Sequence, residues 1–363
     1  MSSTDARHMQ RALVLATRGR GTARPNPMVG CVLVRGGEVL AEGWHKRAGG
    51  DHAEVAALRK IGPGAAAGAT AYVTLEPCNH LGRTGPCTDA LIASGVTRVV
   101  FAMSDPNPHV TGRGRARLFE AGIEVEAGVL EAEAHELNRA WDRWIRTGRP
   151  WVTLKGAVSL DGRIATASGD SKWITGEAAR KEAHRLRAAH DAILVGAGTV
   201  LADDPSLTVR GVRGAEPRRV ILDGRLRISP SARAVPGALV LTTEPSGHEP
   251  FLARGAEVVT LPGDGGRIAL DALLVAIGDR KLTSVLVEGG GQVHGALLRE
   301  GLVDEVHVFV APLFIGGDGV PLLDGVGAAT MADVRRLESR TVKRLGDDVL
   351  VSGRLARHAV SHS

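Results

Sequence analysis

Gly50-Asp-His-Ala-Glu-Val55, then Glu76-Pro-Cys78 and later Cys87, are the stretches that decide the fold and chemistry of this chain. They supply one imidazole, two thiolates and a separate carboxylate. A catalytic zinc ion uses three protein ligands, keeps its fourth position open for water and needs a carboxylate nearby to move protons. The sequence therefore predicts an enzyme with a hydrolytic zinc site, in which the metal ligands are His52, Cys78 and Cys87 and the catalytic base is Glu54.

The local sequence suits this prediction. With His52 at the start of a helix, its imidazole can bind the metal while Glu54 reaches toward the bound water. Because Pro77 fixes its own backbone and lacks an amide hydrogen, we expect Cys78 at a turn that opens a second helix, whose positive end stabilises the thiolate. Zinc nucleobase deaminases share these ingredients, His-x-Glu and then Pro-Cys-x-x-Cys. Here eight residues separate the two cysteines, so Cys87 must return to the metal across a loop.

Each of these residues also has an ordinary structural interpretation. A cysteine in a reducing compartment is usually a small buried apolar residue, and a single histidine more often packs or is solvated than binds metal. The ordered set favours the catalytic interpretation, because two of the three cysteines fall in it. The third, Cys31, lies in an apolar run and is expected in the core. A binding module with a purely structural zinc is an alternative, but a closed site uses four protein ligands and a fourth is not evident.

Length and cysteine content limit the class of protein. A chain of 363 residues is long enough for two domains, each with its own core. Three cysteines form no even disulfide framework, which indicates a reducing compartment. The short apolar patch at 12–16 is interrupted at once by Arg18 and Arg20, so we expect neither a secretory signal nor a membrane span. The prediction is a cytoplasmic protein with no membrane partner.

The formal charge of +5 and the pI near 9.4 raise the question of nucleic acid. A surface that stacks bases would need aromatic residues clustered among basic ones, yet aromatics make up only 3% of the chain and are scattered. Small phosphorylated ligands account for the positive charge equally well. We therefore expect no nucleic-acid partner. A nucleic-acid deaminase, such as a tRNA editing enzyme with an appended domain, is kept as the alternative because it would share the zinc set.

The alternation of apolar runs and helical patterns along the chain indicates two α/β units. From residue 8 to about 146, short apolar runs alternate with helical patterns, which is typical of a sheet covered by helices. Strands are predicted at 29–34, 71–75 and 96–103, and helices at 8–18, 52–60, 87–94, 113–121 and 130–146. The metal residues would thus open the second and third helices, where backbone amides gather. Thr147-Gly-Arg-Pro150 breaks the pattern, so we place the domains at 1–147 and 148–363.

The second unit is predicted to be a longer α/β domain that ends in a hairpin turned at Gly346 and Asp347. Strands are expected at 151–155, 192–195, 218–223, 238–243, 256–260, 284–288 and 305–311, helices at 176–190, 269–279 and 292–300, and the hairpin at 340–355. In Ser284-Val-Leu-Val-Glu-Gly-Gly-Gly-Gln-Val-His294, a buried strand runs into three glycines and a helix, which would let the backbone approach a phosphate. A glycine run alone is equally consistent with an ordinary tight turn.

Taken together, these motifs resemble a known family, the bifunctional deaminase and reductase of riboflavin biosynthesis, over nearly the whole chain. The N-terminal similarity lies in the zinc set and in Arg24-Pro-Asn-Pro-Met-Val-Gly30, Gly43-Trp-His-Lys-Arg-Ala-Gly49 and Asp105-Pro-Asn-Pro-His-Val-Thr-Gly-Arg-Gly114. The C-terminal similarity lies in Lys155-Gly-Ala-Val-Ser-Leu-Asp-Gly-Arg163, Ser171-Lys-Trp-Ile-Thr175, Val195-Gly-Ala-Gly-Thr-Val-Leu-Ala-Asp-Asp-Pro205 and Val287-Glu-Gly-Gly290. The long spacing between the two cysteines is normal for this family.

The resemblance implies an α/β chain with an N-terminal, cytidine-deaminase-like, three-layer domain and a C-terminal domain similar to dihydrofolate reductase. It implies Zn²⁺ and NADPH as cofactors. It further implies two consecutive steps on a pyrimidine that carries a phosphorylated ribosylamino group: hydrolysis of one ring amino group, then reduction of the ribosyl to the ribityl side chain. Glu54 would pass a proton to the departing ammonia. Because two-step enzymes of this kind often assemble, we also expect a homo-oligomer.

The residues of the first pocket follow from the resemblance alone. They would be Asn26, His45, His80, Asp105 and Asn107, lining the base and the ribose. Each has an alternative role. Asn26 stands between two prolines and could serve the turn, Asp105 and Asn107 could cap the next helix, and the two histidines could support other residues or be solvated.

The residues of the reductase site also follow mainly from the resemblance. Lys155, Asp203 and Glu288 are the candidates for polarising the substrate and supplying a proton, with Lys155 and Glu288 as the catalytic pair. Substrate contacts, chiefly to its phosphate, would come from Ser171, Arg187, Leu207, Arg210 and Glu288. NADPH would contact Ala157, Trp173, Thr199, Asp203, Gly290, Gly291, Gln292, Val293, His294, Gly295 and Ala296. The alternatives are a helix-surface charge for Arg187 and a strand-end carboxylate for Glu288.

Overall fold

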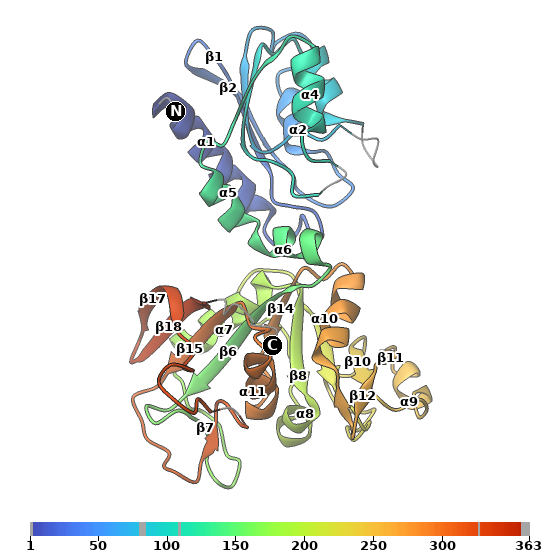
Figure 1. The fold of residues 1–363 in the computed structure, drawn as a ribbon, viewed down its shortest axis with the longest axis vertical. Coiled ribbons are helices and arrows are strands. Elements are labelled where there is room, and N and C mark those ends of the chain that lie inside the picture. The colour runs from blue at the N-terminus through green and yellow to red at the C-terminus, as the bar shows by residue number, and fades with distance from the viewer. Residues whose placement is uncertain (1–2, 80–84, 108–109, 326, 357–363) are drawn as a thin grey trace. The chain divides into compact units, whose positions relative to one another are not determined.

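The computed structural model describes residues 3–79, 85–107, 110–325 and 327–356 (Figure 1). The chain divides into two compact units, the first ending at Gly148 and the second beginning at Arg149. Each unit has its own sheet and its own hydrophobic clusters. Among the described residues, no helix is both long enough and apolar enough to cross a lipid bilayer.

The first unit is built on a five-stranded sheet of order β2-β1-β3-β4-β5. Its strands are β1 (Gly30–Arg35), β2 (Glu38–Trp44), β3 (Thr70–Leu75), β4 (Arg98–Met103) and β5 (Glu124–Ala127). β1 pairs antiparallel with β2 and β3, whereas β3, β4 and β5 are parallel. The polar edge strands β2 and β5 were not predicted, since neither forms the continuous apolar run that marks the three inner strands.

Helices cover both faces of this sheet and make the expected three layers. They are α1 (Ser3–Ala16), the 3₁₀ turn η1 (Thr17–Gly19), α2 (Ala53–Leu58), α3 (Cys87–Ala93), α4 (Arg113–Glu120), α5 (Glu131–Leu137) and α6 (Arg139–Thr147). Successive strand residues point to opposite faces. Thus Val32 packs with the cluster of α1 and α5, while Leu33 packs with the cluster of α2, α3 and α4. Cys31 is fully buried in the latter cluster, as predicted.

One predicted helix of this unit was wrong. The pattern at 130–146 indicated a continuous helix, but the structure breaks it at Asn138, between α5 and α6. The Asn138 side chain accepts a hydrogen bond from the amide of Met28 (2.8 Å) and donates one to its carbonyl oxygen (2.9 Å). This long-range pairing fixes Asn138 outside helical geometry, and a local periodicity cannot reveal it.

The second unit contains a nine-stranded sheet of order β11-β10-β9-β8-β14-β6-β15-β18-β17. Its strands are β6 (Trp151–Val158), β8 (Ala192–Gly196), β9 (Arg218–Leu222), β10 (Leu239–Thr242), β11 (Glu257–Thr260), β14 (Ser284–Val287), β15 (Glu305–Val310), β17 (Leu337–Leu345) and β18 (Asp348–Leu355). All strands from β11 to β15 in this order are parallel, and β18 and β17 add an antiparallel hairpin. The hairpin turns at Gly346 and Asp347, as predicted, since Leu345 pairs with Asp348.

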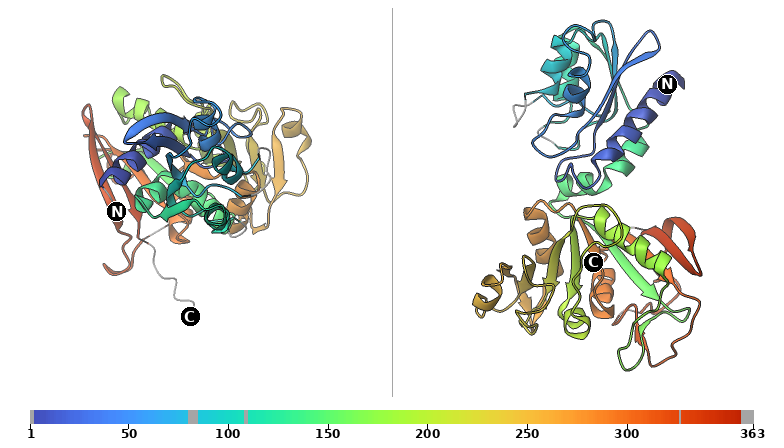
Figure 2. Two further views of the ribbon diagram at one scale, coloured as in Figure 1. Left: turned by 90° about the horizontal axis from the view of Figure 1, so that it is seen from above. Right: turned by 180° about the vertical axis from the view of Figure 1, so that it is seen from behind.

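Both faces of the parallel part are covered, which explains why its central strands are continuous apolar runs. The helices are α7 (Glu177–Ala189), α8 (Ala197–Asp203), α9 (Glu249–Leu252), α10 (Leu270–Asp279) and α11 (Gly291–Arg299). In Figure 1, α10 and α11 lie in front of the sheet, and in the view from behind α7 lies in front (Figure 2). Two short pairs complete the unit, β7 (Arg163–Ala165) with β16 (Val320–Pro321) and β12 (Gly263–Asp264) with β13 (Arg267–Ile268).

Candidate active sites

The first candidate site lies beyond the carboxyl end of β3, where three residues far apart in sequence meet. His52 is the N-cap of α2, Cys78 lies in the loop after β3, and Cys87 is the first residue of α3. His52 Nδ1 lies 3.0 Å from Cys87 Sγ and 3.5 Å from Cys78 Sγ, and the two sulfur atoms are 3.4 Å apart. The expectation that Cys78 opens a helix was wrong, because α3 begins only at Cys87.

The three side chains fit a zinc ion. Tetrahedral bonds of about 2.0 Å to nitrogen and about 2.3 Å to sulfur space the ligand atoms roughly 3.5–3.8 Å apart. The observed separations are 3.0, 3.5 and 3.4 Å, so a bound ion would require the side chains to move apart by up to about 0.5 Å. Within the described part of the chain, the group that could hold a metal consists of these three residues alone. Three protein ligands leave a fourth position for water, which is the arrangement of a catalytic rather than a structural zinc.

Local hydrogen bonds favour the thiolate form of Cys78. Its sulfur lies within hydrogen-bonding distance of the Cys87 sulfur and the His52 ring, and it accepts a hydrogen bond from the Cys87 amide at the start of α3 (3.4 Å). These contacts outweigh the effect of burial and lower the pKa of Cys78 to about 4. A thiolate is the form that binds metal, so the protein prepares this ligand by its own contacts.

Glu54 lies in the first turn of α2 and is 3% exposed. Burial, together with the charge of the nearby Cys78 thiolate, raises the pKa of Glu54 to about 7. A carboxyl group with such a pKa can both accept and return a proton near neutral pH. Glu54 is not part of the group that could hold the ion, so its carboxyl group is left available for proton transfer.

His45 and Asn26 form a hydrogen-bonded pair in the same unit. His45 Nδ1 lies 2.9 Å from the carbonyl oxygen of Asp51, and because a carbonyl can only accept, this nitrogen carries the hydrogen. Nε2 must then accept from Asn26 Nδ2, 3.0 Å away. The His45 ring is buried and packs edge-on against His52, with ring centroids 5.5 Å apart. His45 thereby sets the orientation of the Asn26 amide next to a metal residue.

Asp105 and Asn107 lie in the loop after β4, the strand beside β3. The Asn107 amide donates to Asp105 Oδ1 (2.8 Å). The alternative that they cap the next helix is wrong, because the N-cap of α4 is Gly112. The helix amides are instead bound by Glu76, a residue to which the sequence analysis gave no role although it stands in the Glu-Pro-Cys motif. The remaining predicted pocket residue, His80, lies outside the described residues.

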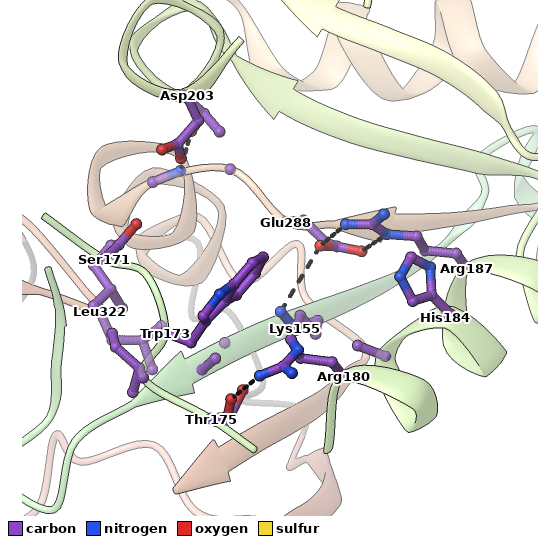
Figure 3. A pocket seen from close by; sticks show the side chains of 18 of the residues that line it. Lys155, Ser171, Trp173, Thr175, Arg180, His184, Arg187, Asp203, Glu288 and Leu322 are labelled. Atoms are coloured by element: carbon purple, nitrogen blue, oxygen red, sulfur yellow. Dashed lines mark hydrogen bonds and ion pairs between the residues drawn. The ribbon is translucent and has the colours of Figure 1, made fainter. Parts of the chain in front are cut away.

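The second candidate site is a cavity of about 590 Å³ in the second unit (Figure 3). Of the predicted residues it is lined by Lys155, Ala157, Ser171, Trp173, Arg187, Thr199, Asp203, Arg210, Glu288, Gly290 and His294. Lys155 comes from β6, Arg187 from α7 and Glu288 from the end of β14. The cavity therefore gathers side chains from both ends of the unit's sequence, at a place where parallel strands β6, β14 and β8 lie side by side.

Glu288 is the carboxylate that pairs with two cationic side chains of this cavity. Its carboxylate accepts from Arg187 Nε (2.7 Å) and Nη2 (2.9 Å) and lies 3.8 Å from Lys155 Nζ. Burial alone would raise the pKa of Glu288, but the charges of Arg187 and Lys155 outweigh it and lower the pKa to about 2. The predicted proton-supplying role of Glu288 conflicts with this, because a carboxylate that stays ionised has no proton to give.

The predicted phosphate contact of Arg187 must also be revised. Its Nη1 donates to the carbonyl oxygen of Thr208 (2.9 Å), while Nε and Nη2 are engaged by Glu288. The guanidinium is therefore bound mainly to protein groups. Other polar residues that line the cavity were missed from the sequence: Arg180, Lys181 and His184. They share the α7 face of Arg187 at intervals of three and four residues, a helical spacing that would have identified them.

Trp173 stands at the cavity with 67% of its surface exposed. The Arg180 guanidinium lies 4.7 Å from its ring centroid and donates to the Thr175 carbonyl oxygen (2.6 Å). On the same helix, His184 Nδ1 accepts from the Arg210 amide (3.2 Å). The indole ring and the Arg180 guanidinium beside it thus place a flat apolar surface and a positive charge together at the cavity.

The glycine-rich turn contributes less to the cavity than predicted. Gly290 and His294 line it, and the Gly290 amide donates to Thr199 Oγ1 (3.1 Å). Gly291, Gln292, Val293, Gly295 and Ala296 do not line it. A Cβ on Gly295 would lie 2.0 Å from the carbonyl oxygen of Asp324, so this glycine is required by chain packing. Leu207, another predicted contact, lies in a hydrophobic cluster away from the lining.

Comparisons with known proteins match both halves of the chain. Residues 2–103 match the family of the cytidine and deoxycytidylate deaminase zinc-binding region, and residues 150–351 match the RibD C-terminal domain. The riboflavin biosynthesis protein RibD of Escherichia coli is 46% identical over 95% of this chain and 98% of its own length. That of Aquifex aeolicus is 42% identical over 96% and 97%.

Solved structures give the same result. RibD of Acinetobacter baumannii superimposes with a TM-score of 0.91 at 40% identity, covering 98% of this chain and 99% of that one. A Thermotoga maritima protein described as a diaminohydroxyphosphoribosylaminopyrimidine deaminase and 5-amino-6-(5-phosphoribosylamino)uracil reductase superimposes with a TM-score of 0.86 at 38% identity, over 97% and 99%. The chain therefore belongs to the RibD family, the bifunctional enzymes of riboflavin biosynthesis that combine a zinc-dependent deaminase with an NADPH-dependent reductase.

Proposed function

We propose that residues 1–147 deaminate a diaminopyrimidine that carries a phosphorylated ribosylamino group, and that residues 148–363 then reduce its ribosyl group to ribityl. The observation that supports the first half most directly is the His52, Cys78 and Cys87 group with the buried Glu54 beside it. The matched regions fall on either side of the junction, at 2–103 and 150–351. The substrate is that named for the Thermotoga maritima relative.

In the deamination, zinc held by His52, Cys78 and Cys87 would supply a hydroxide at neutral pH. Glu54 takes up a proton and delivers it to the departing ammonia, a role worth on the order of 100-fold to 10,000-fold in rate. The hydrogen bond from Asn26 to His45 holds the Asn26 amide in one orientation toward the pyrimidine. Asp105 and Asn107, on the neighbouring loop, bind the polar groups of the ribose.

In the reduction, NADPH would supply a hydride to the first carbon of the opened sugar. Lys155 donates the proton that the sugar oxygen takes up as the ring opens, and the Glu288 carboxylate, 3.8 Å from its Nζ, orients the ammonium group. Arg187 holds Glu288 in place. Arg180 and Lys181 of α7, with Arg210 and Ser171, bind the substrate phosphate, and Trp173 and Thr199 contact the cofactor.

Release of ammonia from the diaminopyrimidine phosphate tests this proposal. The deaminated product should then support NADPH oxidation by the same protein. A nucleic-acid deaminase would leave the small substrate untouched and release ammonia from RNA instead. A structural zinc would give neither reaction, and either result contradicts the proposal.

We also propose that the protein acts in the cytoplasm as a homo-oligomer and binds no nucleic acid. The low aromatic content supports the last point. For the oligomer, β17 lies at the edge of the nine-stranded sheet, where its outer backbone groups could pair with a second copy. Light scattering coupled to gel filtration would give the mass in solution, and a monomer would contradict the homo-oligomer.

A further inference from the structure

We propose that Glu76 is a positioning residue for deamination: its carboxylate locks the loop that carries Asp105 and Asn107 onto the loop that carries Cys78. This inference rests on the proposed deaminase function of the first unit. Among the described residues, the hydrogen bonds to the Glu76 side chain come from backbone amides, so it would act through the backbone around the site.

Four backbone amides converge on this carboxylate. Oε1 accepts from Gly114 and Arg115, both at 3.1 Å, and Oε2 accepts from Gly112 at 3.1 Å and from Asp105 at 3.3 Å. The side chain is 3% exposed, so water does not compete for these hydrogen bonds. Hydrogen bonds from amides to an ionised group are stronger than those between neutral groups. The two oxygens therefore fix the start of α4 and the amide of Asp105 at the same time.

The topology explains why one side chain can reach both loops. β3 and β4 are parallel neighbours, so the loops after them leave the same edge of the sheet. The Glu76 amide donates to the Met103 carbonyl oxygen (2.9 Å), which extends the pairing one step past the strands. Cys78 then follows Glu76 by two residues, and Asp105 follows Met103 by two. Leu75 and Met103 are the last paired residues of β3 and β4, so Glu76 stands directly after the paired region, where the two loops begin to separate.

Close packing at Gly114 supports the same arrangement. A Cβ at this position would lie 2.0 Å from the carbonyl oxygen of Pro77, the residue between Glu76 and Cys78. The first turn of α4 thus rests directly on the backbone that leads to the metal ligand. The N-cap of α4 is Gly112, which has no side chain to bind the helix amides, so Glu76 performs that task from another segment. Because the same carboxylate also binds the Asp105 amide, the capping of α4 is coupled to the position of the loop that carries Asp105 and Asn107.

The decisive variant is Glu76→Gln, which replaces one acceptor oxygen with an amide group that faces amide donors. We expect the KM for the diaminopyrimidine phosphate to rise by on the order of tenfold or more, as loss of hydrogen bonds to a charged group predicts. The turnover number should change less than KM, and one zinc per chain should be retained. Amide hydrogen exchange in residues 110–116 should become faster. Glu76→Asp, which keeps both oxygens on a shorter side chain, should recover part of the KM effect.

Asp5→Asn is the matched control. Asp5 is also a buried carboxylate of the first unit, but it binds Tyr72 and Arg98 near the start of β3 and β4, at the opposite end of those strands. It should lower the melting temperature and leave KM unchanged. Should Glu76→Gln not fold, Glu76→Asp carries the KM and exchange test, and Gly114→Ala separately tests the packing of α4 on Pro77. Wild-type KM and exchange in a folded Glu76 variant would overturn the inference. If the wild-type protein does not deaminate the substrate but Glu76→Gln still makes amide hydrogen exchange faster, that result contradicts the proposed function and not the positioning role of Glu76.

Discussion

Arg187 and Glu288 form a two-point ion pair in the second unit, with Nε and Nη2 of the arginine 2.7 and 2.9 Å from the two carboxylate oxygens. The residues are 101 positions apart in the sequence, and both side chains are largely buried. The pair turns one carboxylate oxygen toward Lys155. The ionised state of Glu288 in this cavity therefore depends on a contact between α7 and the end of β14.

This pair predicts a specific dependence of stability on pH. The pKa of Glu288 is about 2 in the folded protein against 4.5 for an ordinary glutamate, so ionised Glu288 stabilises the fold above about pH 5 and the effect is lost as the pH falls toward 2. The shift corresponds to about 3 kcal/mol. In Glu288→Gln the free energy of unfolding should fall less steeply over that range, as urea titrations would show. Parallel pH profiles for the two proteins would contradict the prediction.

For the first unit, Glu54→Gln should reduce ammonia release by on the order of 100-fold to 10,000-fold, because the glutamine cannot move the proton. Reduction of supplied deaminated substrate by the same variant should be normal and serves as its internal control. Loss of both activities would argue against independent sites.

Removal of zinc by a chelator should abolish ammonia release, leave NADPH oxidation on the deaminated substrate intact, and be reversed by added Zn²⁺. Cys78→Ser should bind less than one zinc per chain, because it replaces a thiolate ligand. Cys31→Ser is the matched control, since Cys31 is a fully buried core residue of the same unit and should leave the zinc content unchanged. Equal zinc content in the two variants would exclude Cys78 as a ligand.

Lys155→Met should lower the turnover of NADPH oxidation by on the order of 100-fold or more, as expected for loss of a positioned proton donor. It removes the ammonium group that lies 3.8 Å from Glu288 while retaining an unbranched side chain. Substrate and NADPH binding, followed by titration calorimetry, should change much less. Deamination by this variant should be unaffected, and unchanged NADPH turnover would mean that another group supplies the proton.

Gly295→Ala should disturb the reductase through packing. The new Cβ would lie 2.0 Å from the Asp324 carbonyl oxygen and so displace the segment that carries Leu322, which lines the cavity. We expect a loss of stability of about 1–3 kcal/mol and a higher KM for NADPH. Gly198→Ala, in α8, is the control because a Cβ there meets nothing within 4 Å. Similar kinetics in both variants would show that the displaced segment does not shape the site.

A structural feature could be predicted from the sequence when the residues that cause it are close together in the chain. The metal residues were recognisable because zinc demands particular atoms in a set order, and the inner strands because burial on both faces requires apolar runs. β2 and β5 escaped prediction since neither forms a continuous apolar run. The break at Asn138 and the pairing of Arg187 with Glu288 escaped because each depends on a partner about a hundred residues away. The role of Glu76 was hidden for a similar reason, as three of its four partners lie on or beside α4.

The junction at Gly148 has a consequence for inheritance. Every metal residue and Glu54 precede it, and every residue that lines the reductase cavity follows it. Splitting the coding sequence there would divide neither constellation of side chains, so two separate genes could encode the same pair of described sites. Because one peptide chain joins the two halves, each translated molecule contains one copy of each half. Their ratio is therefore one to one at any level of gene expression.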